Sequence, residues 1–172
     1  MSNIHKFEVL IKEPWLCEDL DPPEDPLGEL TELENSLQMF CYECNHRVVL
    51  KIGEESKELF LDPDIILDLK YLPEQMRELS LGKRVDIDFP ESWLMMKFLP
   101  EGDIISCTLR EFGNSPITKE FKVDKAQVLE MLQGFLNELM QMAIAKGYIT
   151  YEQKEEFLGG WNLMPETTVS IP

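Results

Sequence analysis

The chain has 172 residues, of which 44% are hydrophobic, and this is enough apolar material for the core of one globular domain spanning residues 1–172. Its 33 acidic and 16 basic residues give a formal net charge of −17. A charge of this sign repels nucleic acids and anionic membrane surfaces, so we expect neither nucleic acid nor a membrane as a partner.

Targeting and redox features are those of a cytoplasmic protein. The N-terminus, MSNIHKFEVLIKEPW, lacks the basic stretch and continuous apolar core of a signal peptide. No stretch approaches the roughly 18 apolar residues that span a bilayer. We therefore predict a cytoplasmic protein with reduced cysteines, namely Cys17, Cys41, Cys44 and Cys107.

The first predicted element is a strand over residues 5–12, in which Phe7, Val9 and Ile11 alternate with charged residues. Pro14 ends this strand. An acidic loop and a helix follow, together covering residues 13–38. The helix is expected over residues 26–38, with Asp25 as its N-cap and leucines at helical spacing.

The acidic segment carries the clearest functional signal in the sequence. Residues 13–34 contain nine acids and no Lys or Arg, and such a run attracts cations or a basic protein partner. A merely solvated loop and loose calcium binding are the alternatives, although the loop lacks the spacing of an EF-hand. We predict partner binding by an aromatic anchor and a set of steering carboxylates: Trp15, Glu18, Asp19, Asp21, Glu24 and Asp25.

The middle of the chain is predicted to form a hairpin, two short helices and a run of four antiparallel strands. The hairpin comprises residues 47–52 and 57–61 around Gly53-Glu54-Glu55-Ser56. The short helices are expected from Asp62 to Lys70 and from Pro73 to Leu81. The four strands are expected over residues 84–89, 93–99, 103–111 and 117–123.

The C-terminal part is predicted to be helical. Asp124 caps a long helix over about residues 125–146, and Thr150 with Gln153 forms a capping box that opens a final helix to about Leu158. We expect residues 159–172 to form a loosely held tail. The fold class is therefore α+β: an antiparallel sheet of about six strands, with helices on one face and a long C-terminal helix.

The only motif with metal-ligand spacing is Cys41-x-x-Cys44-x-His46. A structural zinc site needs four ligands, and the second CxxC is missing, so a distant Cys17 or Cys107 would have to complete it. A redox role is disfavoured because the pair leads into a predicted strand rather than opening a helix. We expect structural cysteines, no metal and no cofactor.

The sequence shows no catalytic constellation. Asp86 and Asp88 share one face of a predicted strand and could form a pair of catalytic carboxylates. Alternating aspartates on a strand are, however, the ordinary pattern of a solvent-exposed face. We therefore predict that the protein is not an enzyme.

A family resemblance covers residues 47–140, about half of the chain. Within it, a strand ends in Phe89-Pro90-Glu91-Ser92-Trp93-Leu94, a strand begins with Gly102-Asp103-Ile104-Ile105, and the long helix opens with Asp124-Lys125-Ala126-Gln127. This order of elements resembles bacterial toxin-immunity proteins of the wall-associated toxin immunity group. The resemblance implies neutralisation of a toxin delivered between neighbouring cells, and it implies no catalytic residues.

We therefore expect a non-enzymatic, cytoplasmic binding protein whose partner is a basic protein. An immunity protein that blocks a basic toxin domain is the specific form of this hypothesis, because nucleases that act on polyphosphates have basic surfaces. Two alternatives remain open: a metal-binding module using Cys41, Cys44 and His46, and a small hydrolase whose site is assembled from distant residues.

Overall fold

The computed structural model describes residues 4–14 and 28–159. The acidic residues 15–27 and the tail residues 160–172 lie outside the described part of the chain. The described elements, in chain order, are β1 (Ile4–His5), β2 (Phe7–Pro14), α1 (Glu32–Glu43), β3 (His46–Ile52), β4 (Glu55–Phe60), the π-helical turn η1 (Leu61–Ile65), α2 (Ile66–Leu69), α3 (Leu72–Ser80), β5 (Val85–Phe89), the 3-10 turn η2 (Pro90–Ser92), β6 (Leu94–Glu101), β7 (Ile104–Glu111), β8 (Ile117–Asp124), α4 (Lys125–Ala145) and α5 (Tyr151–Leu158).

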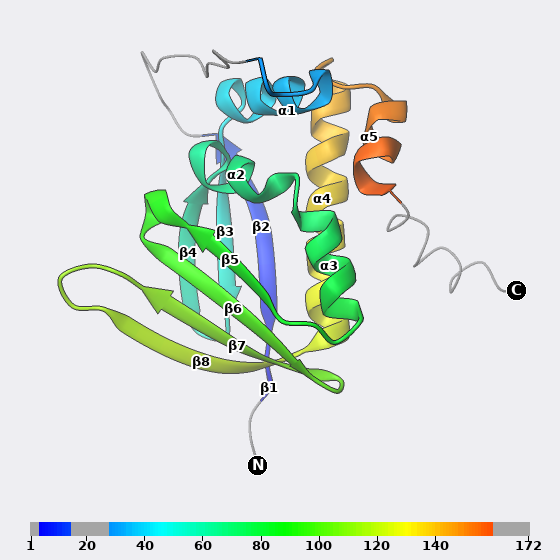
Figure 1. The fold of residues 1–172 in the computed structure, drawn as a ribbon. Helices are drawn as coiled ribbons and strands as arrows, with labels where there is room; N and C mark the ends of the chain where they lie inside the picture. The colour runs from blue at the N-terminus through cyan, green and yellow to red at the C-terminus, as the bar shows by residue number, and fades with distance from the viewer. Residues whose placement is uncertain (1–3, 15–27, 160–172) are drawn as a thin grey trace, which may run out of the picture.

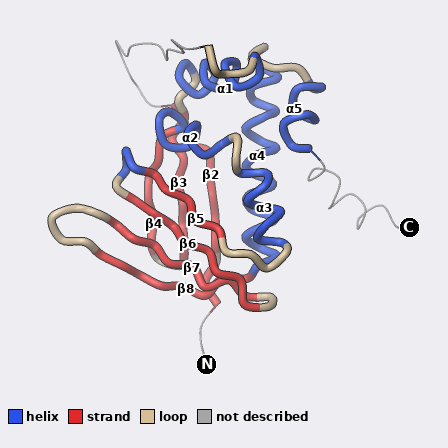
Figure 2. The backbone as a smooth tube through the Cα atoms, viewed as in Figure 1, coloured by secondary structure: helices blue, strands red, loops and turns tan. Residues whose placement is uncertain are grey.

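The strands form two sheets, and the α+β class is confirmed (Figure 2). A five-stranded sheet has the order β1-β8-β7-β6-β5, and a three-stranded antiparallel sheet has the order β2-β3-β4. The expected single sheet of about six strands is thus divided into two. The larger sheet is also mixed, because β1 pairs with β8 in parallel.

The division arises within the predicted strand 5–12. Ile4 and His5 pair with β8, whereas Phe7 onward pairs with β3, so the chain changes sheet at Lys6. At this crossing the side chain of Gln127 bonds both backbone groups of Phe7, with N···Oε1 3.0 Å and Nε2···O 2.9 Å. The Lys6 carbonyl accepts a bond from Gly53 N at 3.0 Å. These bonds satisfy backbone groups that would otherwise lose partners where the ladders separate.

The first helix differs from its prediction. Residues 28–31 are not helical, and α1 runs from Glu32 to Glu43 rather than over 26–38. Thr31 is the N-cap: its Oγ1 accepts a bond from Glu34 N, and the Glu34 carboxylate accepts one from Thr31 N. This reciprocal capping box satisfies two backbone donors that a helix start leaves free, so it fixes the boundary.

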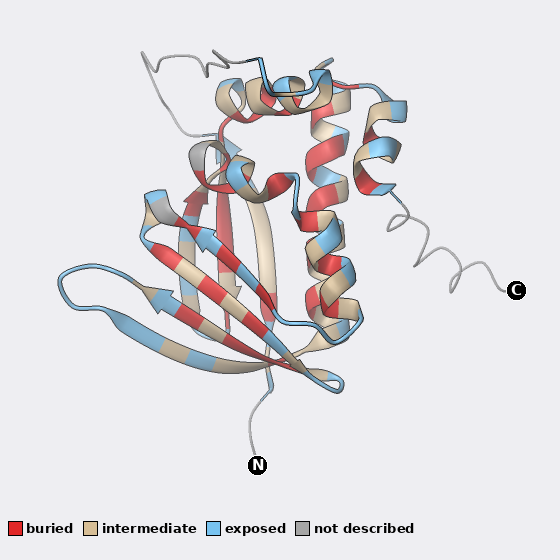
Figure 3. Ribbon diagram, viewed as in Figure 1, coloured by how far each residue is buried: buried red, intermediate tan, exposed pale blue. Residues whose placement is uncertain are grey.

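The alternation and capping predicted elsewhere are confirmed. In β5, Val85, Ile87 and Phe89 are buried while the two aspartates between them are exposed. Asp124 caps α4, and the Thr150–Gln153 capping box opens α5. One apolar face of α4 is buried (Figure 3), and it comprises Val128, Leu132, Phe135, Leu136, Leu139 and Ala143.

The core lies between the two sheets and the long helix. Phe7 of β2 and Phe98 of β6 meet edge to face there, with ring centroids 6.0 Å apart. The helix α4 packs along β2, and α3 packs on α4 and on β5 and β6 (Figure 1). Among the described helices, none is both long enough and apolar enough to cross a membrane.

Candidate functional site

The predicted partner-binding residues fall in the part of the chain that the structure does not describe. Trp15, Glu18, Asp19, Asp21, Glu24 and Asp25 all lie within residues 15–27. The described remainder of the acidic segment is Glu13 at the end of β2, Glu29 before α1, and Glu32 and Glu34 in its first turn. Glu13 pairs with Arg47 at 3.4 Å. The candidate site is therefore built from the elements that border this segment.

A hollow of about 450 Å³ lies between α1, α2 and α5, and we call it the groove. It begins directly after the undescribed acidic residues, since Glu29 and Leu30 line it. Figure 1 shows α1 crossing the top of the molecule above α2. Most of the lining side chains are apolar, namely Leu30, Leu33, Leu37, Ile66, Leu67, Leu69, Tyr71 and Phe157.

The charged groups of the groove are mainly acidic. Glu29, Glu34 and Lys70 line it together with the apolar residues. Hydrogen bonding from the Thr31 backbone lowers the pKa of Glu34, and the nearby Lys70 acts in the same direction. The Lys70 ammonium lies 3.6 Å from the Glu34 carboxylate, so this cation is already balanced by an acid of the groove. Glu29 and Glu34 against Lys70 leave the rim with one net negative charge. An apolar floor with such a rim fits a ligand that is both apolar and basic.

The Cys41-x-x-Cys44-x-His46 motif does not form one cluster. Cys41 is buried in the last turn of α1, and burial raises the pKa of its thiol. Cys44 is the C-cap of the helix and donates to Tyr148 Oη at 3.9 Å, whereas His46 Nδ1 lies 2.6 Å from the Lys12 carbonyl. In residues 4–14 and 28–159 no group of three His, Cys, Asp or Glu side chains is arranged to hold a metal ion.

The sequence context predicted for this motif is confirmed, because the pair leads into β3 at His46 and does not open a helix. The structure adds that Cys41 and Cys44 lie at the end of α1. A helix C-terminus carries partial negative charge, so it disfavours a thiolate. The location of Cys41 and Cys44 at the end of α1 therefore also disfavours activation of either thiol.

Asp64 and Asp68 form an acidic pair that the sequence analysis did not predict. Asp64 in η1 is fully buried; its Oδ2 accepts bonds from Phe60 N at 2.9 Å and Ser92 Oγ at 2.6 Å. One turn later, burial and the neighbouring Asp88 and Asp64 raise the pKa of Asp68 to about 6. Within the described residues, Asp64 Oδ1 and Asp68 Oδ2 are buried without a hydrogen-bond partner.

The two predicted strand aspartates do not act as a pair. Asp86 binds Arg84 through both carboxylate oxygens, each at 3.1 Å, whereas Asp88 affects the titration of Asp68. The spacing of Asp64 and Asp68 on one helical face was the only signal in the sequence for the acidic pair. Their environment depends on Ser92 and Asp88, which are distant in sequence.

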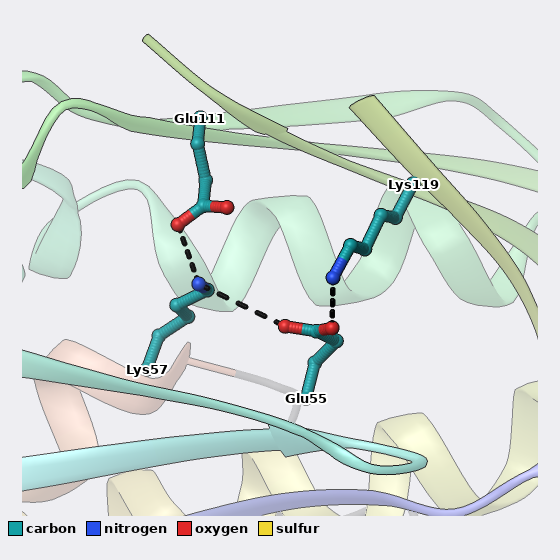
Figure 4. Close-up of polar contacts among 4 residues, drawn as sticks. All are labelled: Glu55, Lys57, Glu111 and Lys119. Atoms are coloured by element: carbon teal, nitrogen blue, oxygen red, sulfur yellow. Dashed lines mark hydrogen bonds and ion pairs between the residues drawn. The ribbon is translucent and has the colours of Figure 1, made fainter. Parts of the chain in front are cut away.

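A chain of ion pairs links β4, an edge strand of the three-stranded sheet, to β7 and β8 of the five-stranded sheet (Figure 4). Lys57 of β4 binds Glu111 of β7 and lies 3.8 Å from Glu55, which in turn binds Lys119 of β8. Bonding to Lys119 lowers the pKa of Glu55. Each of the four charged side chains has a partner of opposite sign. We therefore interpret these ion pairs as stabilising the contact between the sheets rather than as a ligand site.

Comparison with known proteins adds no assignment: no family model, no curated protein and no solved structure matches this chain. The resemblance to toxin-immunity proteins therefore stays a prediction. The groove is the candidate site because it combines volume, apolar surface and acidic charge in one place.

Proposed function

We propose that the protein is a non-enzymatic binding protein that holds a basic protein partner in the groove between α1, α2 and α5. The observation that supports this most directly is the groove itself. Its volume is about 450 Å³, most of its lining is apolar, and Glu29 and Glu34 lie among its lining residues. Burial of apolar side chains supplies affinity at such a site. Acidic charge favours association with basic partners and disfavours acidic ones.

The charge of the whole chain supports the same kind of partner. A formal net charge of −17 produces a field that attracts basic proteins over a distance, and nine of the acids lie in residues 13–34. Neutralisation of a basic toxin domain is the specific activity that we propose within this class. The Cys41, Cys44 and His46 alternative gains no support from the separate contacts that these side chains make.

The experiment measures binding of a fluorescent 14-residue amphipathic peptide of Leu and Lys, with a peptide of Leu and Glu as the charge control. Leu67 is an exposed groove residue, so Leu67→Lys changes the groove without opening the core. We expect Leu67→Lys to weaken binding at least tenfold, which corresponds to about 1.4 kcal/mol.

The matched control is Leu81→Lys, since Leu81 is also an exposed leucine but lies at the end of α3 outside the groove. It should bind within about twofold of wild type, because a distant surface substitution leaves the groove intact. Equal effects of the two substitutions, or equal binding of the acidic and basic peptides, would refute the groove as a binding site.

A further inference from the structure

The groove adjoins the end of the last described helix. Phe157, in the final turn of α5, is half-buried and lines the groove, while Leu158 beside it is buried in the core. Helix α5 ends at Gly159, whose φ of +57° suits glycine and turns the chain out of the helix. The chain therefore leaves α5 two residues after a side chain that forms part of the groove wall.

The groove contains large apolar side chains that are exposed. Leu67 and Tyr71 are each 52% exposed, and both line it. Single exposed apolar residues are common on protein surfaces, whereas apolar residues gathered in one hollow mark a place that another segment or molecule covers. The floor of the groove therefore fits an occupant with large apolar side chains.

Two segments of the chain adjoin the groove in sequence, and their charges distinguish them as occupants. Residues 15–27 precede Glu29 and contain five acids and no base, so Glu29 and Glu34 of the groove repel them. The tail residues 160–172 follow α5 and contain one acid, Glu166, and no base. The large apolar residues of the tail are Trp161, Leu163, Met164, Val169 and Ile171. The tail is therefore the segment of this chain that matches the apolar floor.

We propose that residues 160–172 fold back onto the groove in the free protein, with Trp161 against Leu67 and Tyr71, and that a basic partner displaces them. This inference rests on the proposed function, because it names what occupies the same groove before the partner binds. Trp161 follows Phe157 by four residues, so even an extended chain places it within about 14 Å of Phe157. A segment tethered this closely has an effective concentration of the order of millimolar.

Charge gives a basic partner its advantage over the tail. The rim of the groove has one net negative charge, from Glu29 and Glu34 against Lys70, and the tail has no cation to pair with it. The tail gains only from apolar burial, whereas a partner that is both apolar and basic gains from burial and from charge. The tail is thus a cover that favours basic partners over ligands that are merely apolar.

The first experiment tests this cover without any partner. The readout is the indole N–H resonance of Trp161 in a ¹⁵N–¹H spectrum of the full chain, assigned by its loss in Trp161→Phe. We expect Leu67→Lys to move this resonance to its position in an isolated peptide of residues 160–172, because lysine removes the apolar contact. Leu81→Lys, outside the groove, should leave it unchanged. A Trp161 resonance at the peptide position in wild type, or an equal response to the two lysine variants, would overturn the proposal.

The second experiment measures competition between the tail and the amphipathic peptide of Leu and Lys. Trp161→Ser should strengthen binding of this peptide at least about threefold, because the groove is then open in a larger fraction of the molecules. Leu81→Ser also removes an exposed apolar side chain but lies outside the groove, so it should bind the peptide as wild type does.

The two experiments separate this proposal from the proposed function. If Leu67→Lys weakens peptide binding and Trp161→Ser does not change it, the groove binds a basic ligand and the cover is refuted. If no peptide binds and Leu67→Lys still moves the Trp161 resonance, the tail occupies the groove and the proposed function is refuted instead.

Discussion

Asp68 is a residue whose chemistry is set by its position in the fold. It lines a void of about 50 Å³ whose other lining residues are all apolar, and the charged groups that act on it are Asp64 and Asp88. Among the described residues, no cation lowers the pKa of Asp68. Burial and two like charges therefore favour the protonated carboxyl, which places its pKa near 6 rather than at the ordinary 3.8.

Replacing Asp68 by Asn should make the protein more stable at neutral pH. Because the folded-state pKa is raised, the stabilising effect of the protonated carboxyl is complete below about pH 4 and is lost as the pH rises through about 6. For this half-buried group the loss at pH 7 is about 1–2 kcal/mol after allowance for solvent screening. Asp68→Asn should remove that loss, as measured by urea unfolding between pH 4 and pH 8.

The control for this prediction is Asp86→Asn, because Asp86 is exposed and paired with Arg84. Its stability curve should lack the gain at neutral pH that Asp68→Asn shows. If wild type and Asp68→Asn give parallel curves across the whole range, Asp68 is ionised in the folded protein as it is in the unfolded chain.

At the scale of elements, the start of α1 was predicted at the wrong residue although the sequence contains the capping box that fixes it. The sequence offers two helix starts, Asp25-Pro26 and Thr31 with Glu34 three residues later. The structure uses the second, and Gly28 with φ +64° precedes it in a backbone conformation that no α-helix has. The start of α1 matters for function because Leu33, Glu34 and Leu37 of this helix form one wall of the groove.

Thr31→Ala should therefore lower the free energy of unfolding by about 1 kcal/mol, because the Glu34 backbone N–H loses its acceptor. Thr31→Ser is the matched control and should retain most of the stability, since serine keeps the hydroxyl. Both are measured by urea unfolding at one pH. An alanine variant as stable as the serine variant would show that Thr31 does not cap α1.

A second feature at this scale is the contact between the edge strand β4 and the strands β7 and β8 of the other sheet. No backbone ladder joins the two sheets where β4 faces β7 and β8, and the ion-pair chain from Glu111 through Lys57 and Glu55 to Lys119 links them instead (Figure 4). Charged side chains on a sheet edge also oppose pairing with another strand. This arrangement requires strands distant in sequence, so alternation alone could not predict it.

At the scale of the whole molecule, the main property is the negative field. Neutralising Asp19, Asp21, Glu24 and Asp25 to Asn or Gln should slow association with the Leu-Lys peptide, and wild-type association should fall steeply as salt is added. The reason is that long-range attraction is screened over about 8 Å at roughly 0.15 M salt. Stopped-flow fluorescence at several salt concentrations measures both effects.

Dissociation rate and stability serve as the controls for the quadruple variant. Both should change little, because surface substitutions of this kind have small effects on folding. Salt-independent association, with the quadruple variant as fast as wild type, would show that residues 18–25 do not steer the partner. The groove experiment would be unaffected by that outcome, since it depends on Leu67.

The sequence by itself determined the features that depend on short-range periodicity and capping. The alternation of β5, the buried stripe of α4 and the caps at Asp124 and Thr150 follow from neighbouring residues, as does the net charge. Only the tertiary structure decided that the strand 5–12 divides between two sheets at Lys6. It also decided which helices enclose the groove and that Ser92 meets Asp64. These features depend on pairing between segments far apart in the chain, and local patterns do not specify that pairing.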